Sequence, residues 1–81
     1  PPPKQDESGD LYDSAWQLAG MSQGVCAAIV SYQGGGPWLF VYEIGSNGLW
    51  VLNYSTQIMG GSVQGLSVGP TVIAIKLRLV E

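Results

Sequence analysis

The chain has 81 residues, a formal net charge of −3, one cysteine and no histidine, and 11% of its residues are charged while 46% are hydrophobic. This composition excludes an internal disulfide and a Cys/His zinc site, and no run of 18 apolar residues exists that would cross a membrane as a helix. Beyond residue 13 the chain holds two basic residues, which argues against binding to nucleic acid. Because so small a domain buries only about 60 to 65% of its unfolded-chain surface, we expect it to need neighbouring chains.

Residues 1–9 differ in composition from the rest. They contain three prolines and no apolar anchor, which predicts a flexible, Pro-rich acidic arm followed by a single small β domain over residues 10–81. A solvated tail or linker is the simpler interpretation of the arm, and a Pro-rich ligand for a groove is the alternative. The first thirteen residues carry a net charge of −3 and the remainder is neutral. The absence of an initiator Met and of a signal-peptide pattern fits a processed chain or a fragment.

Residues 10–20 predict one short helix. Asp10 is placed as its N-cap, Asp13 lies at the third helical position, and Gly20 is a natural stop. Leu11, Ala15, Leu18 and Ala19 would share one face of this helix. Trp16 is then expected to pack the helix against a sheet.

Residues 25–32 form a continuous apolar run of strand length. Continuous hydrophobicity, in place of alternation, indicates a central strand that is buried on both faces. Cys26 lies within it and has no neighbouring His or basic residue, so an inert buried thiol is favoured over a nucleophile. The glycines at 34–36 lack the Lys-Ser/Thr of a phosphate-binding loop and predict a turn before Pro37.

Residues 38–44 and 49–54 are rich in aromatic and β-branched residues and flank Asn47-Gly48, the strongest short-range hairpin signal. The loop is either Asn47-Gly48 alone or residues 45–48, and both choices predict the same faces. One face carries Trp38, Phe40, Tyr42, Ile44, Leu49, Val51 and Asn53, and the other carries Leu39, Val41, Glu43, Trp50, Leu52 and Tyr54. Neither face is polar, so we expect protein or a ligand against both sides.

The rest of the chain predicts a loop with one short or bulged strand near 62–68, and then a strand over 71–81. Four glycines leave the backbone of 57–69 bare, which makes this segment a candidate contact for a partner or ligand. In the last strand, Ile73, Ile75, Leu77 and Leu79 are expected to face a core. If that strand joins the same sheet as the hairpin, Glu43 is expected to share a face with Lys76 and Arg78. A cross-strand charge pair there would then indicate how the strands are aligned.

The inventory of reactive groups predicts a protein that is not an enzyme and that needs no cofactor. Without histidine, acid–base chemistry falls to carboxylates, and four of the six acids lie in or beside the arm. Glu43 stands alone in the folded part, so no carboxylate pair of the glycosidase kind is visible.

The spacing of aromatic residues in the predicted strand over residues 49–54 indicates a candidate binding site. Trp50 and Tyr54 are predicted to project from one face of their strand, beside Leu39 and Val41 of the neighbouring strand. The candidate ligand- or partner-binding residues are Trp50, Tyr54, Leu39, Val41 and Leu52. A core or subunit contact, a protein-binding surface and stacking on carbohydrate all fit these residues.

Taken together, the sequence predicts a mainly β fold: a short N-terminal helix and four or five antiparallel strands in a small sandwich or barrel. The expected function is a non-enzymatic structural or adhesion-type module that self-associates, as a homo-oligomer or as one partner chain of an extracellular or virion-surface assembly such as a fibre, shell or filament. A glycan or protein receptor is a candidate partner. The alternative is a soluble binding module that recognises a glycan or peptide through Trp50, Tyr54 and the 57–69 segment.

Overall fold

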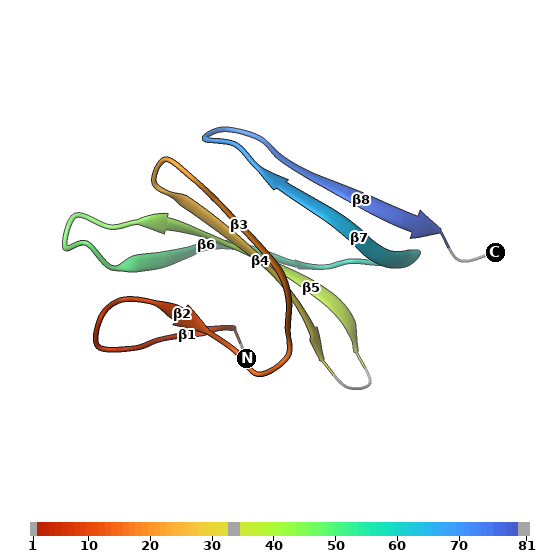
Figure 1. Cartoon of the computed structure of the whole chain (residues 1–81), viewed down its shortest axis with the longest axis horizontal. Coiled ribbons are helices and arrows are strands. Elements are labelled where there is room, and N and C mark those ends of the chain that lie inside the picture. Colours follow the sequence, from red (N-terminus) through yellow and green to blue (C-terminus); the bar gives the residue numbers. More distant parts are fainter. Residues whose placement is uncertain (1, 33–34, 80–81) are drawn as a thin grey trace.

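The computed structural model describes residues 2–32 and 35–79, and within these ranges every regular element is a β-strand (Figure 1). The predicted mainly β class is therefore confirmed, with eight strands where four or five were expected. The strands are β1 (Lys4–Gln5), β2 (Leu11–Tyr12), β3 (Trp16–Ser22), β4 (Val25–Tyr32), β5 (Gly36–Ile44), β6 (Trp50–Gln57), β7 (Gly61–Val68) and β8 (Ile73–Leu79).

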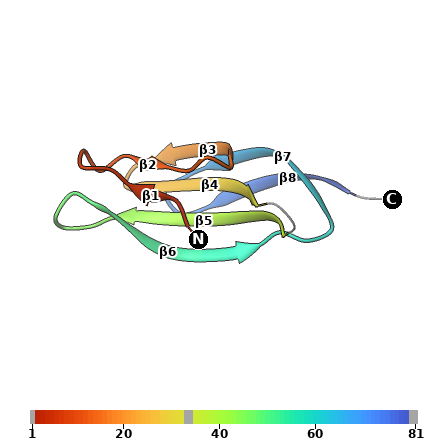
Figure 2. The same ribbon diagram turned by 90° about the horizontal axis from the view of Figure 1, so that it is seen from below.

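An antiparallel four-stranded sheet, in the order β3-β4-β5-β6, forms the centre of the molecule (Figure 2). β4 is a central strand, as its continuous apolar run predicts, and its residues from Cys26 to Val30 are all buried. Both faces of the sheet are apolar along β4 and β5, so each face needs a cover.

Two hairpins supply the covers. β7 and β8 pair with each other and pack on the face that carries Ala27, Ile29, Leu39 and Val41. The smaller hairpin of β1 and β2 lies on the opposite side, where Cys26, Ala28, Val30, Phe40 and Tyr42 form the second core cluster (Figure 1). The resulting body is thin, with principal extents of 45 × 26 × 15 Å.

The predicted helix over residues 10–20 is wrong. Leu11–Tyr12 is β2, a turn follows, and β3 begins at Trp16. The carboxylate of Asp13 accepts a hydrogen bond from the Ala15 N–H at 2.8 Å, so it stabilises this turn and not a helix end. In β3, half-buried residues alternate with exposed ones, and Gly20 lies within the strand. A bulge between Trp16 and Leu18 places their side chains on opposite faces of the sheet, where Trp16 packs on the Cys26 cluster and Leu18 on the Ile29 cluster.

The segment expected to be a flexible arm contains β1. Lys4 and Gln5 pair with Tyr12 and Leu11, and the loop between the two strands is built around Asp6. Its carboxylate accepts the backbone N–H groups of Ser8 and Asp10, each at 2.9 Å. Asp10 thus belongs to a hairpin loop and caps no helix, and Pro1 lies outside the described residues.

β7 and β8 appear where strands near 62–68 and over 71–81 were predicted, but they form their own sheet. β8 pairs with β7 and not with the β5–β6 hairpin, so the condition for Glu43 to share a sheet face with Lys76 and Arg78 is not met. Glu43 instead accepts a hydrogen bond from the side-chain amide of Asn53 at 3.1 Å. Ile73 and Ile75 pack on the core, as predicted, whereas Leu77 and Leu79 are exposed, and residues 80–81 lie outside the described ranges.

Candidate functional site

The turn between β5 and β6 has a loop length that neither predicted alternative has. The Gly45 N–H donates to the Leu49 carbonyl at 2.7 Å, and the Gly48 N–H donates to the Gly45 carbonyl at 3.0 Å. Gly48 has a φ of 80°, and no described residue other than glycine has a positive φ. This is a three-residue loop, in which a type I turn is followed by a glycine in the left-handed region.

The odd loop length changes which side chains share a face. Trp50 lies opposite Ile44 and Leu52 opposite Tyr42, so both side chains are on the β1–β2 side of the sheet. A bulge between Leu52 and Tyr54 then restores the predicted register, and Tyr54 lies opposite Val41 on the β7–β8 side. The predicted single face with Trp50, Leu52 and Tyr54 together is therefore wrong.

The five predicted site residues divide into core and surface. Leu39 and Val41 belong to the core that β7 and β8 cover, with exposed fractions of 7% and 9%. Trp50 is half-buried against the other core cluster. Leu52 and Tyr54 are exposed, at 41% and 56%, on opposite faces of β6. Of the five, these two are the ones the fold leaves most open to a partner.

Exposed apolar side chains gather around the free end of the β5–β6 hairpin and along β6. We call this group the β6 surface, and its members are Ile44, Leu49, Val51, Leu52 and Tyr54. Glu43 is the one charged residue within β5 and β6. An apolar strand at the edge of a sheet, with solvent on both faces, is typical of an interaction site.

The edge of β6 is occupied at its first residue by a side chain from β1. The Trp50 N–H donates to the side-chain carbonyl of Gln5 at 2.7 Å, and the Gln5 side-chain amide donates to the Trp50 carbonyl at 2.7 Å. The Tyr42 hydroxyl donates to the Pro3 carbonyl at 3.2 Å and holds the same segment. No signal in the sequence identifies Gln5, because the contact joins residues 45 positions apart.

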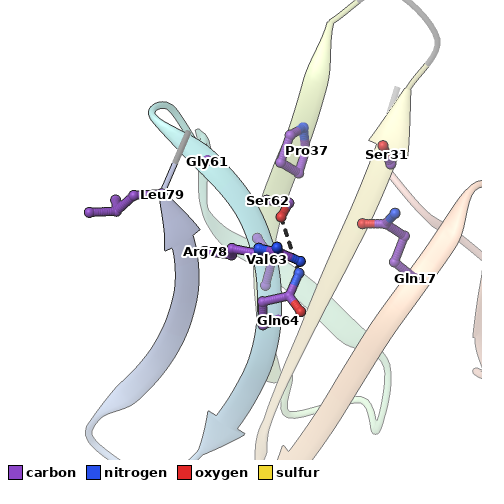
Figure 3. Close-up of a pocket in the computed structure, with 9 residues that line it drawn as sticks. All are labelled: Gln17, Ser31, Pro37, Gly61, Ser62, Val63, Gln64, Arg78 and Leu79. Atoms are coloured by element: carbon purple, nitrogen blue, oxygen red, sulfur yellow. Dashed lines mark hydrogen bonds between the residues drawn. The ribbon is translucent and has the colours of Figure 1, made fainter. Parts of the chain in front are cut away.

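A pocket of about 600 Å³ with both polar and apolar lining residues lies between the β7–β8 hairpin and the ends of β3, β4 and β5 (Figure 3). Its polar side chains are Gln17, Ser31, Ser62, Gln64 and Arg78, and the Gln64 amide donates to the Ser62 hydroxyl at 3.1 Å. β7 thus contributes residues 61–64 of the 57–69 segment to this pocket. None of the described residues that line this pocket carries a carboxylate side chain.

A second pocket, of about 500 Å³, is apolar and lies between the β1–β2 hairpin and the sheet. Trp16 and Trp50 both line it, together with Met21 and Cys26. Burial raises the pKa of the Cys26 thiol, so the nucleophilic thiolate is disfavoured there. Sequence reasoning singled out Trp50 but not its proximity to Trp16, because Trp16 was assigned to a helix.

The described residues contain no group of three or more His, Cys, Asp or Glu side chains that could hold a metal ion. Residues 2–32 and 35–79 also include no helix long and apolar enough to cross a membrane. Comparisons of the chain with protein-family models, with curated proteins and with solved structures each found no match.

Proposed function

We propose that the chain is a non-enzymatic structural or adhesion-type module that associates with copies of itself through the β6 surface. We place it in an extracellular or virion-surface assembly such as a fibre, shell or filament. The observation that carries the proposal is the exposure of Val51, Leu52 and Tyr54 on both faces of an unpaired edge strand. Soluble monomers normally protect such an edge with charge, proline or a covering element.

The surface area of the chain supports the same proposal. A compact monomer of 8.6 kDa is expected to expose about 4,700 Å², whereas this chain exposes 5371 Å². The excess is close to the roughly 800 Å² that each partner buries in a protein–protein interface of standard size. Burial of about this area on association would therefore bring the exposed area of the chain to that of an ordinary globular protein.

The test is the mass of the particle in solution, measured by light scattering after size-exclusion chromatography. We expect the wild-type chain to run as an oligomer and the double variant Leu52→Ser, Tyr54→Ser to run as a folded monomer. Met59→Ser is the matched control, because Met59 is also exposed but lies outside the β6 surface. A wild-type chain of monomer mass at every concentration, or equal dissociation by the control, would refute the proposal.

A second candidate, a module that binds a glycan or peptide, is favoured by the apolar pocket between Trp16 and Trp50. A glycan array probed with the wild-type chain and with Trp50→Ala tests it. Glycan binding that Trp50→Ala abolishes without changing oligomer size would favour this candidate. Dissociation of the oligomer by Trp50→Ala, with no glycan bound, would favour the assembly module.

A further inference from the structure

We infer that β6 pairs antiparallel with β6 of a second copy across a two-fold axis at Ser55, and that the Gln5 side chain limits this pairing at Trp50. The inference rests on the proposed self-association and specifies how it occurs. It follows from the direction of the backbone groups along β6, the lack of charge on β6 and the contact made by Gln5.

The backbone groups of β6 that point away from β5 can be assigned from printed contacts. Trp50 turns its N–H and C=O to Gln5, so they point outward. Backbone direction alternates along an antiparallel strand, hence Leu52 also points outward. Beyond the bulge, the Ile58 N–H donates inward to the Pro37 carbonyl at 2.9 Å. Counting back from Ile58, the backbone groups of Gln57 and Ser55 point outward.

The outward row of Leu52, Ser55 and Gln57 has none of the usual protection against strand pairing. β6 contains no charged residue and no proline over its whole length. β8, by contrast, carries Lys76 and Arg78, which hinder edge-to-edge association. β6 is thus an unprotected edge, in contrast to β8 with its two charges.

A second copy is the partner that this edge fits. Two uncharged β6 strands meet without electrostatic repulsion, and a two-fold axis makes the contact self-complementary. With Ser55 on the axis, Ser55 pairs with its symmetry mate and Leu52 pairs with Gln57 of the other copy, so the whole outward row is used. Tyr54 then lies beside Thr56 of the other copy and loses its exposure on the β7–β8 side.

Gln5 sets the end of the paired region. Its side-chain amide hydrogen-bonds to both the N–H and the C=O of Trp50, the same two groups that a residue of a neighbouring strand would bind. A partner strand cannot extend past Leu52 while this contact is present. The β1–β2 hairpin thereby excludes any register that needs the backbone groups of Trp50.

Amide hydrogen exchange, followed by NMR at increasing protein concentration, tests the inference. In dilute solution the Leu52, Ser55 and Gln57 amides should exchange fast, while the inward-pointing Val51, Thr56 and Ile58 amides are protected. As the chains associate, the three outward amides should slow by about tenfold when about nine-tenths of the chains are paired, because exchange then proceeds through the free monomer. Oligomers in which these amides stay fast overturn the inference and leave the proposed self-association standing, whereas a lasting monomer overturns both.

Variants provide an independent test. Ser55→Pro removes one outward N–H that β5 does not use, so the chain should stay folded but dissociate. Ser55→Ala is the matched control, because it keeps the N–H and should associate like the wild type. Should Ser55→Pro disturb the fold, Leu52→Lys places a charge on the edge without changing the backbone and should also dissociate the oligomer. Association unchanged in folded Leu52→Lys, or lost in Ser55→Ala, would contradict the proposed pairing.

Gln5→Ala tests the limit at Trp50. The variant should free the Trp50 amide, which then exchanges fast in dilute solution and becomes protected as the chains associate. The Leu52, Ser55 and Gln57 amides should behave as in the wild type. If the Trp50 amide of the variant stays fast in the oligomer, Gln5 does not set the end of the pairing.

Discussion

Gly20 shows how closely the two sheets approach each other. A Cβ built at this residue would lie 2.7 Å from Val68 Cγ2, nearer than side-chain atoms pack. Gly20→Ala should therefore lower the free energy of unfolding by about 1 to 3 kcal/mol, the usual range for overpacking. Gly65→Ala is the control, since its Cβ would lie 3.5 Å from Lys76 Cβ, an ordinary contact. Urea unfolding at one fixed protein concentration measures both, and equal stability of the two variants would contradict the packing described.

Gly48 is required for its backbone conformation and not for space. Its φ of 80° lies in the left-handed region, and a Cβ there would meet no atom within 4 Å. Gly48→Ala should cost about 1 kcal/mol in unfolding free energy, from backbone strain alone. The same urea experiment tests this, and an unchanged midpoint would show that the turn is not the three-residue loop described.

Tyr42 makes stability depend on pH at the alkaline end. Burial, helped by nearby Tyr32, raises its pKa to about 12 from an ordinary value of 10. The folded chain favours the neutral phenol of Tyr42. Above pH 10 the phenol ionises in the unfolded chain but stays neutral in the folded chain up to about pH 12, and this difference favours unfolding. The free energy of unfolding should fall as pH rises from 10 to 12.

Tyr42→Phe isolates this effect. The variant cannot ionise, so its stability should fall less steeply over that pH window, although loss of the hydrogen bond to Pro3 should cost about 0.5 to 1.5 kcal/mol at neutral pH. Unfolding curves of the two proteins from pH 8 to 12 provide the comparison. Parallel curves would mean that Tyr42 does not titrate differently in the folded state.

At the scale of elements, β4 and β6 are expected to have different roles. Ile29 in β4 is fully buried and packs under the β7–β8 hairpin, so Ile29→Ala should cost about 2 to 5 kcal/mol of stability. Leu52→Ala in β6 should destabilise the monomer much less and mainly weaken association, because its side chain is 41% exposed. Thermal unfolding in dilute solution, combined with light scattering at high concentration, separates the two effects. Equal losses of monomer stability would contradict this division.

Element types were predictable where one periodicity dominates. The unbroken apolar run of β4 and the alternation of β8 identify both strands, because each pattern fits one structure. Residues 10–20 were misassigned because Leu11, Ala15, Leu18 and Ala19 share one helix face, whereas in the structure a turn before Trp16 and a bulge between Trp16 and Leu18 interrupt the segment. Asp13, which resembles a helix-capping residue, instead makes an Asx-type contact in a turn.

The candidate site was predictable only in part, because its faces depend on loop length. Asn47-Gly48 predicted the hairpin correctly, but the odd three-residue loop moved Trp50 and Leu52 to the β1–β2 side. A bulge then returned Tyr54 to the predicted face. A one-residue change in register reverses every side chain that follows it, and sequence patterns do not resolve that difference. The Gln5 contact with Trp50 depends on tertiary packing and has no local signal.

At the scale of the whole molecule, the chain is a thin stack built around one sheet. Its radius of gyration is 12.7 Å, whereas a compact domain of this length would have about 11.7 Å. The covers of the central sheet are a pair of two-stranded hairpins, which leave β6 exposed on both faces and along its edge. If the chain self-associates as proposed, this shape is completed only in the oligomer.

Sedimentation equilibrium of the wild-type chain over a wide range of concentrations tests that claim most directly. The account predicts an average mass that rises from 8.6 kDa to at least the dimer value as concentration increases, and a return to the single-chain mass in Leu52→Lys. A mass that stays at 8.6 kDa at every concentration would contradict it.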